Sequence, residues 1–164
     1  MVNSVEVMNI LQMNNVRYNM YEHPPLDNAK AAESIRHKVK GEICKTLFLT
    51  DNSGAYWLVT VPLDARVDLK KLAQQLGSGR LTFGDAQSMQ DFLGVKPGSV
   101  TPLAVINDTE NRVRLVLEES IMSFEMINIH PFINTLSVDL DPRVVLMFAE
   151  DYGHVPLFVK DIFV

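Results

Sequence analysis

The sequence has little of what an exported or membrane-bound protein needs. It contains a single cysteine, Cys44, so no disulfide can form within the chain. No apolar run approaches the roughly 18 residues that would cross a bilayer. The first residues, MVNSVEVMN, lack the basic start and the long apolar stretch of a signal peptide. These absences predict a cytoplasmic protein in a reducing compartment, with no membrane association.

The sequence also lacks the short motifs of common cofactor and metal enzymes. It contains no Walker loop, GxGxxG, GxSxG or HExxH motif, and His23, His37 and His154 show no metal-ligand spacing. We therefore expect neither a metal nor a cofactor. The chain is 47% hydrophobic and 21% charged over 164 residues, which fits one globular domain spanning 1–164 and excludes disorder and coiled coil.

An excess of positive charge is lacking as well, because the net charge is -5. Residues 1–106 nevertheless carry 11 Lys/Arg and 10 Asp/Glu, and residues 107–164 carry 4 and 10, so the two parts have net charges of +1 and -6. Two basic groups lie in the first part: Lys30, Arg36, Lys38, Lys40 and Lys45, then Arg66, Lys70, Lys71 and Arg80. They are either solvated faces or contacts for a polyanion, so the net charge does not exclude a nucleic acid partner.

Hydrophobic periodicity and turn signals predict an α+β fold, in which helices surround a mixed, largely antiparallel sheet. Helices are predicted over 3–14, 27–36, 68–77, 85–93 and 141–153. Strands are predicted over 17–22, 43–50, 55–61, 81–83, 103–106, 112–118, 125–129, 135–140 and 157–162. Turn residues at 51–54 predict one hairpin, and 107–111 is predicted to join its flanking strands in another.

Three positions combine a reactive or flexible group with a place that a ligand could reach. Lys45 shares one face of the strand 43–50 with aliphatic residues, where an ammonium is costly unless it reaches water or a cleft. Gly98 to Pro102 form a loop that could aim backbone N–H groups at an oxyanion, and His130 lies at a strand end. Each also has an ordinary reading, as a snorkelling lysine, a surface turn and a capping histidine. Cys44, on the opposite strand face, is interpreted as a core residue rather than a nucleophile.

Four segments carry a resemblance to a known family: EHPP at 22–25, CKTLFL at 44–49, GVKPGSVTPLAVIND at 94–108 and NIHPFINT at 128–135. On these segments the chain resembles the YbaK/ProX family of aminoacyl-tRNA deacylases, which is similar to the editing domain inserted in bacterial prolyl-tRNA synthetases. The resemblance covers essentially the whole chain. It looks closest to the free-standing branch that deacylates Ala-tRNA(Pro), and it departs from that branch's pattern at Thr46 and at 136–137.

The resemblance implies a YbaK-like fold and a trans-editing hydrolase that cleaves the aminoacyl ester at the tRNA 3′ end. Water would attack the ester with help from the terminal ribose 2′-hydroxyl, and a pocket sized for alanine would exclude proline. The implied catalytic residues are Lys45, Gly98, Ser99, Val100, Thr101 and His130. The implied residues for binding substrate and tRNA are Met20, His23, Lys45, Arg80, Pro102 and Asn134.

The implied partner is the acceptor end of an aminoacyl-tRNA, with prolyl-tRNA synthetase as a further candidate. Other functions stay open at this point. The same fold could hydrolyse Cys-tRNA(Pro) or Ser-tRNA, or the chain could be a tRNA-binding module without turnover. A third alternative is an α+β domain that binds some other small ligand.

Overall fold

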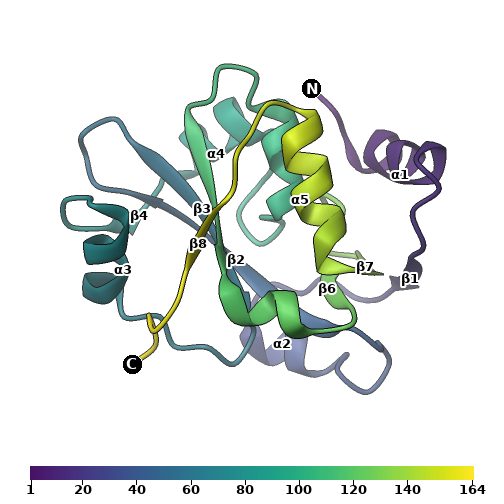
Figure 1. Cartoon of the computed structure of the whole chain (residues 1–164). Coiled ribbons are helices and arrows are strands. Elements are labelled where there is room, and N and C mark those ends of the chain that lie inside the picture. Colours follow the sequence, from purple (N-terminus) through teal and green to yellow (C-terminus); the bar gives the residue numbers. More distant parts are fainter.

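The computed structural model of the protein describes all 164 residues and is built on one sheet of eight strands (Figure 1). The strands are β1 (Asn19–Glu22), β2 (Glu42–Thr50), β3 (Tyr56–Pro62), β4 (Thr82–Phe83), β5 (Val113–Glu118), β6 (Ile127–Ile129), β7 (Leu136–Leu140) and β8 (Leu157–Val159). Their order is β1-β7-β6-β2-β3-β5-β8, and β4 pairs with β2 off this path. The pairs β2·β6, β3·β5 and β5·β8 are parallel and the other four are antiparallel, so the predicted α+β class with a mixed sheet is confirmed.

Five α-helices and two 3₁₀-helices connect the strands. They are α1 (Ser4–Met13), α2 (Ala29–Glu33), α3 (Leu69–Leu76), α4 (Ala86–Leu93), α5 (Pro142–Asp151), η1 (Pro102–Asn107) and η2 (Glu119–Ser123). Polar N-cap side chains begin all five α-helices, and α3 and α4 end at glycines with a φ of +66°. Only glycine adopts that left-handed conformation without strain, which is why both helices stop there. None of the helices has the length and apolar character needed to cross a membrane.

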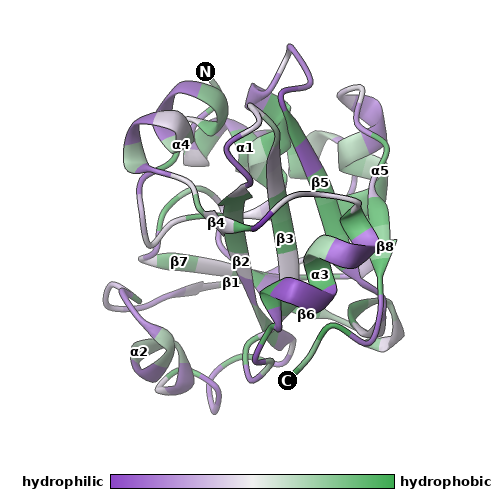
Figure 2. Ribbon diagram, turned by 90° about the vertical axis from the view of Figure 1, so that its left-hand side faces the viewer, coloured by the Kyte–Doolittle hydropathy of each residue, from purple (hydrophilic) through white to green (hydrophobic).

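Apolar side chains cover both faces of the sheet. Leu58 and Leu115 belong to a cluster of 23 buried residues that packs α1, α4, α5 and η1 against one face. Their strand neighbours Trp57, Val59 and Val116 belong to a second cluster, which packs α3 against the other face. Figure 2 shows the central strands as largely hydrophobic ribbons, whereas α3 turns hydrophilic residues outward. Because successive side chains of a strand point to opposite faces of the sheet, alternate residues of the same strand belong to two different cores.

One predicted strand is wrong. Residues 103–106 lie in η1 and form no strand. The predicted hairpin between 103–106 and β5 is therefore absent, and β5 pairs in parallel with β3 and β8 instead. Pro102 is suited to the first position of the 3₁₀-helix, because the backbone N–H that proline lacks would have no partner within the helix there. Thr101 caps the helix, since its Oγ1 accepts a hydrogen bond from Leu103 N at 3.4 Å. All six residues of η1 are buried. A short buried apolar run has the same sequence pattern in a strand and in a buried helical turn.

A buried carboxylate ties the start of β2 to the neighbouring strands. Asp139 on β7 is fully buried and accepts hydrogen bonds from Tyr21 Oη at 2.6 Å, Asn19 Nδ2 at 3.1 Å, Asn128 Nδ2 at 3.0 Å and Gly41 N at 3.0 Å. Burial alone would raise the pKa of Asp139, but these hydrogen bonds together hold it below its ordinary value. The ionised carboxylate therefore joins β1, β6, β7 and the turn before β2.

Replacing this carboxylate should destabilise the fold strongly. Asp139→Ala leaves the buried donors of Asn128 and Gly41 unpaired, which should cost about 3 kcal/mol or more of unfolding free energy. Because folding lowers the pKa of Asp139, its contribution is present above the unfolded pKa of about 4 and is lost as the pH falls further. Denaturant unfolding at neutral and acid pH measures both effects. Asp151→Ala, at an exposed position, is the control, and an Asp139→Ala protein as stable as this control would contradict the assignment.

Candidate active site

The middle of β2 has one open edge. Along the other edge, β2 pairs with β3 from Cys44 to Thr50. On the open side, β6 pairs only with Glu42–Ile43 and β4 only with Leu49–Thr50, so the residues between them have no strand partner there. Pairing switches from one neighbouring strand to another across this gap. The gap leaves room for a cavity beside the backbone of β2.

A cavity of about 340 Å³ lies across this edge. Its walls come from five separate parts of the chain: 26–29 with Ala32 at α2, 43–47 on β2, Leu63 after β3, Gly98 with Val100, and 128–130 at the end of β6. A cavity of this volume suits a small ligand or one end of a larger one. The sheet order brings these parts together although they are far apart in the sequence.

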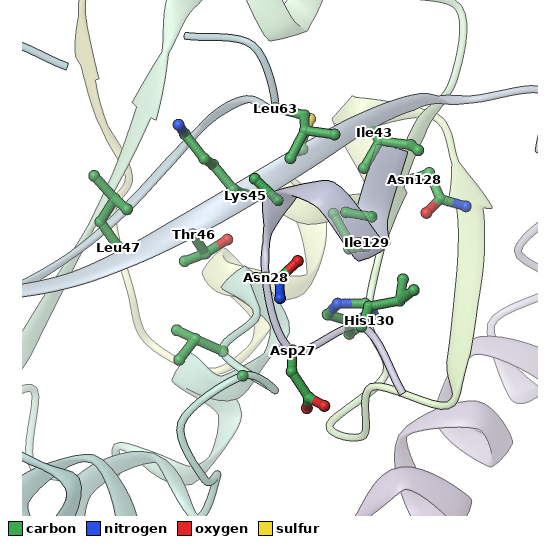
Figure 3. Close-up of a pocket in the computed structure, with 16 residues that line it drawn as sticks. Asp27, Asn28, Ile43, Lys45, Thr46, Leu47, Leu63, Asn128, Ile129 and His130 are labelled. Carbon is green, nitrogen blue, oxygen red and sulfur yellow. The ribbon is translucent and has the colours of Figure 1, made fainter. Parts of the chain in front are cut away.

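Lys45 supplies the cavity with an unpaired ammonium. Its Nζ makes no hydrogen bond or ion pair within the protein, and burial lowers the pKa of Lys45, partly offset by the carboxylate of Asp64. In Figure 3, Lys45 and Thr46 leave the strand on opposite sides. Thr46 faces the side that holds Asn28 and His130, whereas Lys45 extends on the other side. The cavity therefore reaches around the edge of the strand, with Lys45 on one side only.

His130 supplies a neutral imidazole. Its Nδ1 lies 3.2 Å from the carbonyl oxygen of Leu136. A carbonyl can only accept, so Nδ1 carries the proton and Nε2 has the free lone pair. Burial lowers the pKa of His130, and the neighbouring His23, with ring centroids 6.3 Å apart, acts in the same direction. His130 is therefore an acceptor rather than a cation near neutral pH.

Two amide side chains line the cavity in fixed orientations. Asn28 Oδ1 accepts a hydrogen bond from Ala31 N at 2.8 Å, which leaves its Nδ2 without a partner in the protein. Asn128 Nδ2 donates to Ser137 Oγ at 3.2 Å and to the Asp139 carboxylate at 3.0 Å, which leaves its Oδ1. The cavity thus contains one oriented amide donor and one oriented amide acceptor.

Gly98 and Asn134 meet at the rim of the cavity. Gly98 has a φ of +87°, a conformation that other residues rarely adopt, and a Cβ there would stand 3.5 Å from Asn134 Nδ2. Asn134 Nδ2 donates to Asp27 Oδ1 at 2.9 Å, and Asp27 is the only carboxylate that lines the cavity. Of the predicted site residues, Lys45, Gly98, Val100 and His130 line the cavity, and Asn134 contacts its rim.

The other predicted site residues lie outside the cavity. Ser99, Thr101 and Pro102 are buried in the loop and η1 behind Gly98. His23 is also buried and does not line the cavity, although its ring lies beside that of His130. Met20 on β1 and Arg80 after α3 are exposed and do not line the cavity.

Three polar residues of the cavity escaped the sequence analysis: Asp27, Asn28 and Asn128. Asn28 had a detectable signal, because asparagine is a preferred N-cap and a helix is predicted to begin beside it. Asn128 begins the motif segment 128–135, but its orientation had no signal, because it depends on Asp139, eleven residues away on another strand. No three His, Cys, Asp or Glu side chains lie close enough together to hold a metal ion.

Comparison with known proteins identifies the class. Residues 23–148 match the family model of the aminoacyl-tRNA editing domain. The chain is 35% identical over 150 residues to prolyl-tRNA synthetase associated domain-containing protein 1 of Bos taurus, covering 88% of this chain and 87% of the relative. It is 31% identical over 126 residues to the prolyl-tRNA editing protein ProX of Acetoanaerobium sticklandii, covering 76% and 77%.

A solved structure of a candidate trans-editing enzyme for prolyl-tRNA synthetase has the same fold, with a TM-score of 0.71 at 18% identity over 96% of each chain. The fold and the matched residues are those of an aminoacyl-tRNA editing domain. The chain belongs to the aminoacyl-tRNA editing domain family, and the resemblance inferred from the four sequence segments is confirmed.

Cys44 lines the cavity but lacks the chemistry of a nucleophile. Burial, together with Glu42 and Glu118, raises the pKa of Cys44 to about 12, so its thiolate is scarce at neutral pH. At about pH 8 we expect the native thiol to react with iodoacetamide roughly a thousandfold more slowly than the denatured chain. Alkylation followed by mass spectrometry measures both rates. Equal rates in the two states would contradict this assignment.

Proposed function

We propose that this protein is a trans-editing hydrolase that removes alanine from mischarged Ala-tRNA(Pro). The observation that carries the proposal is the meeting of three of the four motif segments at one cavity, through Lys45, Gly98 and His130, together with residues 26–28, which directly follow the remaining segment. These segments are separated by up to a hundred residues in the sequence, so their convergence is a property of the fold. The names of the relatives support proline tRNA as the substrate carrier.

The charges of the cavity match those of an aminoacylated tRNA end. That end carries a phosphate diester on one side and an α-ammonium group on the other. Lys45 is the only lysine or arginine that lines the cavity, and it would hold the terminal phosphate or the ester carbonyl. Asp27, the only carboxylate, sits at the opposite rim with Gly98 and would face the ammonium.

Hydrolysis by water fits the chemistry of these side chains. Water would add to the ester carbon, the bond to the tRNA 3′ oxygen would break, and that oxygen would take the proton. The 2′-hydroxyl of the terminal ribose would help to activate the water, since the cavity holds no activated protein nucleophile. The Nε2 lone pair of His130 would orient the substrate or the water, and Gly98 and Val100 would limit the size of the amino acid.

The contact with tRNA would be small. Arg36 pairs with Glu33, Glu42 and Asp64, so it is already neutralised by neighbouring carboxylates. Lys30 on α2 stays exposed beside the cavity. We propose that the unit of function is the whole chain, 1–164, acting on the acceptor end of proline tRNA, with prolyl-tRNA synthetase as the partner that produces the mischarged substrate.

A panel of charged tRNAs tests the substrate. We expect rapid deacylation of Ala-tRNA(Pro) and survival of Pro-tRNA(Pro), because a pocket that admits alanine can exclude a larger ring. Cys-tRNA(Pro) and Ser-tRNA are included to distinguish an Ala-tRNA(Pro) deacylase from deacylases that act on these two substrates. Release of labelled amino acid, corrected for spontaneous hydrolysis, is the measurement. Equal attack on the alanyl and prolyl forms would refute editing, and tRNA binding without any hydrolysis would indicate a non-catalytic module.

Removal of the Lys45 ammonium should separate activity from stability. Lys45→Met keeps the apolar stem and should lower kcat/KM about 100-fold, since it removes a charged contact to the substrate. The unfolding midpoint should stay the same or rise, because the ammonium has no partner in the protein and burial lowers its pKa. Lys70→Met, an exposed lysine of the second basic group, is the matched control. Wild-type turnover by Lys45→Met would remove Lys45 from the site.

A further inference from the structure

The orientation of the Asn28 side chain assigns it a role in the reaction. We propose that Asn28 Nδ2 donates a hydrogen bond to the carbonyl oxygen of the aminoacyl ester and stabilises the negative charge that develops there. The proposal rests on the proposed hydrolysis of aminoacyl-tRNA and adds a catalytic residue to it. The donor is the side-chain amide itself and not the backbone of the short helix α2.

The hydrogen bond at the start of α2 determines which atom of Asn28 faces the cavity. Ala31 N is a donor, so the atom 2.8 Å from it must be the oxygen of the Asn28 amide. The NH₂ group then points the other way. A reversed amide would place two donors against each other and lose the cap, so the orientation is held by the fold before any substrate arrives.

The free NH₂ group points into the cavity. Figure 3 shows the Asn28 nitrogen directed into the space between Thr46, His130 and Asp27. Asn28 lines the cavity and has an exposed position at its mouth, where a substrate can reach it. Its nitrogen makes no hydrogen bond within the protein. An acceptor atom in this half of the cavity would meet an unoccupied donor.

The other side-chain donors near this space are occupied or lie elsewhere. Thr46 Oγ1 is 3.0 Å from Thr60 Oγ1 and shares a hydrogen bond with it, and the NH₂ of Asn128 is bound by Ser137 and Asp139. Lys45 extends on the opposite side of β2. His130 offers an Nε2 lone pair, which is an acceptor. Of the side-chain amides that line the cavity, Asn28 is therefore the one with a free NH₂ on the Thr46 side.

The step that needs this donor is the addition of water. When the water oxygen bonds to the ester carbon, the π electrons of the carbonyl move onto its oxygen. The water proton passes to the ribose 2′-hydroxyl, which hands on its own proton to the 3′ oxygen as that oxygen leaves. A donor already oriented toward that oxygen stabilises the charge without having to reorganise. When the bond to the tRNA 3′ oxygen breaks, the carbonyl forms again and the charge disappears. Asn28 keeps its own protons throughout.

Asparagine differs from aspartate at an N-cap because its oxygen accepts the capping bond while its NH₂ remains a donor. Asp68, Asp85 and Asp141 cap three other helices of this protein, so aspartate at position 28 would serve the cap equally well. Asn28→Asp therefore keeps the size and the cap of the residue while it replaces the free NH₂ by a carboxylate oxygen. Asn28→Ser also keeps the cap and removes the NH₂ group, leaving a shorter side chain with only a hydroxyl.

Steady-state kinetics on Ala-tRNA(Pro) with these two variants test the proposal. We expect kcat to fall about 100-fold in Asn28→Ser and at least as far in Asn28→Asp, as is typical for the loss of one oxyanion donor. KM should change less than about threefold, because the bond strengthens in the transition state. The unfolding midpoints should match the wild type. Asn3→Asp is the matched control, since Asn3 caps α1 in the same way outside the cavity.

The outcomes separate this inference from the proposed function. Wild-type deacylation with an undiminished kcat in Asn28→Ser would overturn the role of Asn28 and leave the proposed function standing. A change in KM alone would show that Asn28 only binds the substrate in its ground state, which also overturns the proposal. A wild-type protein that hydrolyses no aminoacyl-tRNA would refute the proposed function itself. Loss of kcat in Asn3→Asp would reveal a stability effect common to both caps and would count against the proposal.

Discussion

The open edge in the middle of β2 is the constraint on which the site depends. A strand in the interior of a sheet normally has hydrogen-bonded neighbours on both sides. Here β6 and β4 each cover only two residues of one edge, one at either end, and the backbone between them is left for a ligand. The cavity follows from this gap, because side chains on both sides of β2 and residues from four other parts of the chain border it.

Buried polar contacts keep the gap and its side chains in place. Asp139 draws together the turn before β2 and the strand β6, and it also holds Asn128 by the amide nitrogen. Asn134 links the loop after β6 to Asp27, next to Gly98. Each of these bonds joins segments about a hundred residues apart or on different strands. The position of polar groups around the cavity therefore follows from long-range hydrogen bonds more than from local structure.

The electrostatics of the molecule agree with a small contact to nucleic acid. The net charge of -5 arises from the last third of the chain, whereas the parts that border the cavity come largely from the nearly neutral first two thirds. Ion pairs occupy Arg36, so the first basic group is weaker than its composition suggests. A protein of this kind gains affinity from fitting the end of its substrate and less from attraction to the whole backbone.

The sequence determined the local elements, since capping residues, glycine stops and hydrophobic alternation act over a few residues. It also determined the family, through segments such as 94–108 and 128–135, and it placed Lys45 correctly on a strand face opposite Cys44. It misjudged 103–106, because a short buried apolar run has the same sequence pattern in a strand and in a 3₁₀-helix. Only the tertiary structure decided that Lys45, Gly98 and His130 share a cavity while Met20 and Arg80 stay outside it. The orientations of Asn28 and Asn128 were decided there as well, because the direction of an amide depends on hydrogen-bond partners that folding brings to it.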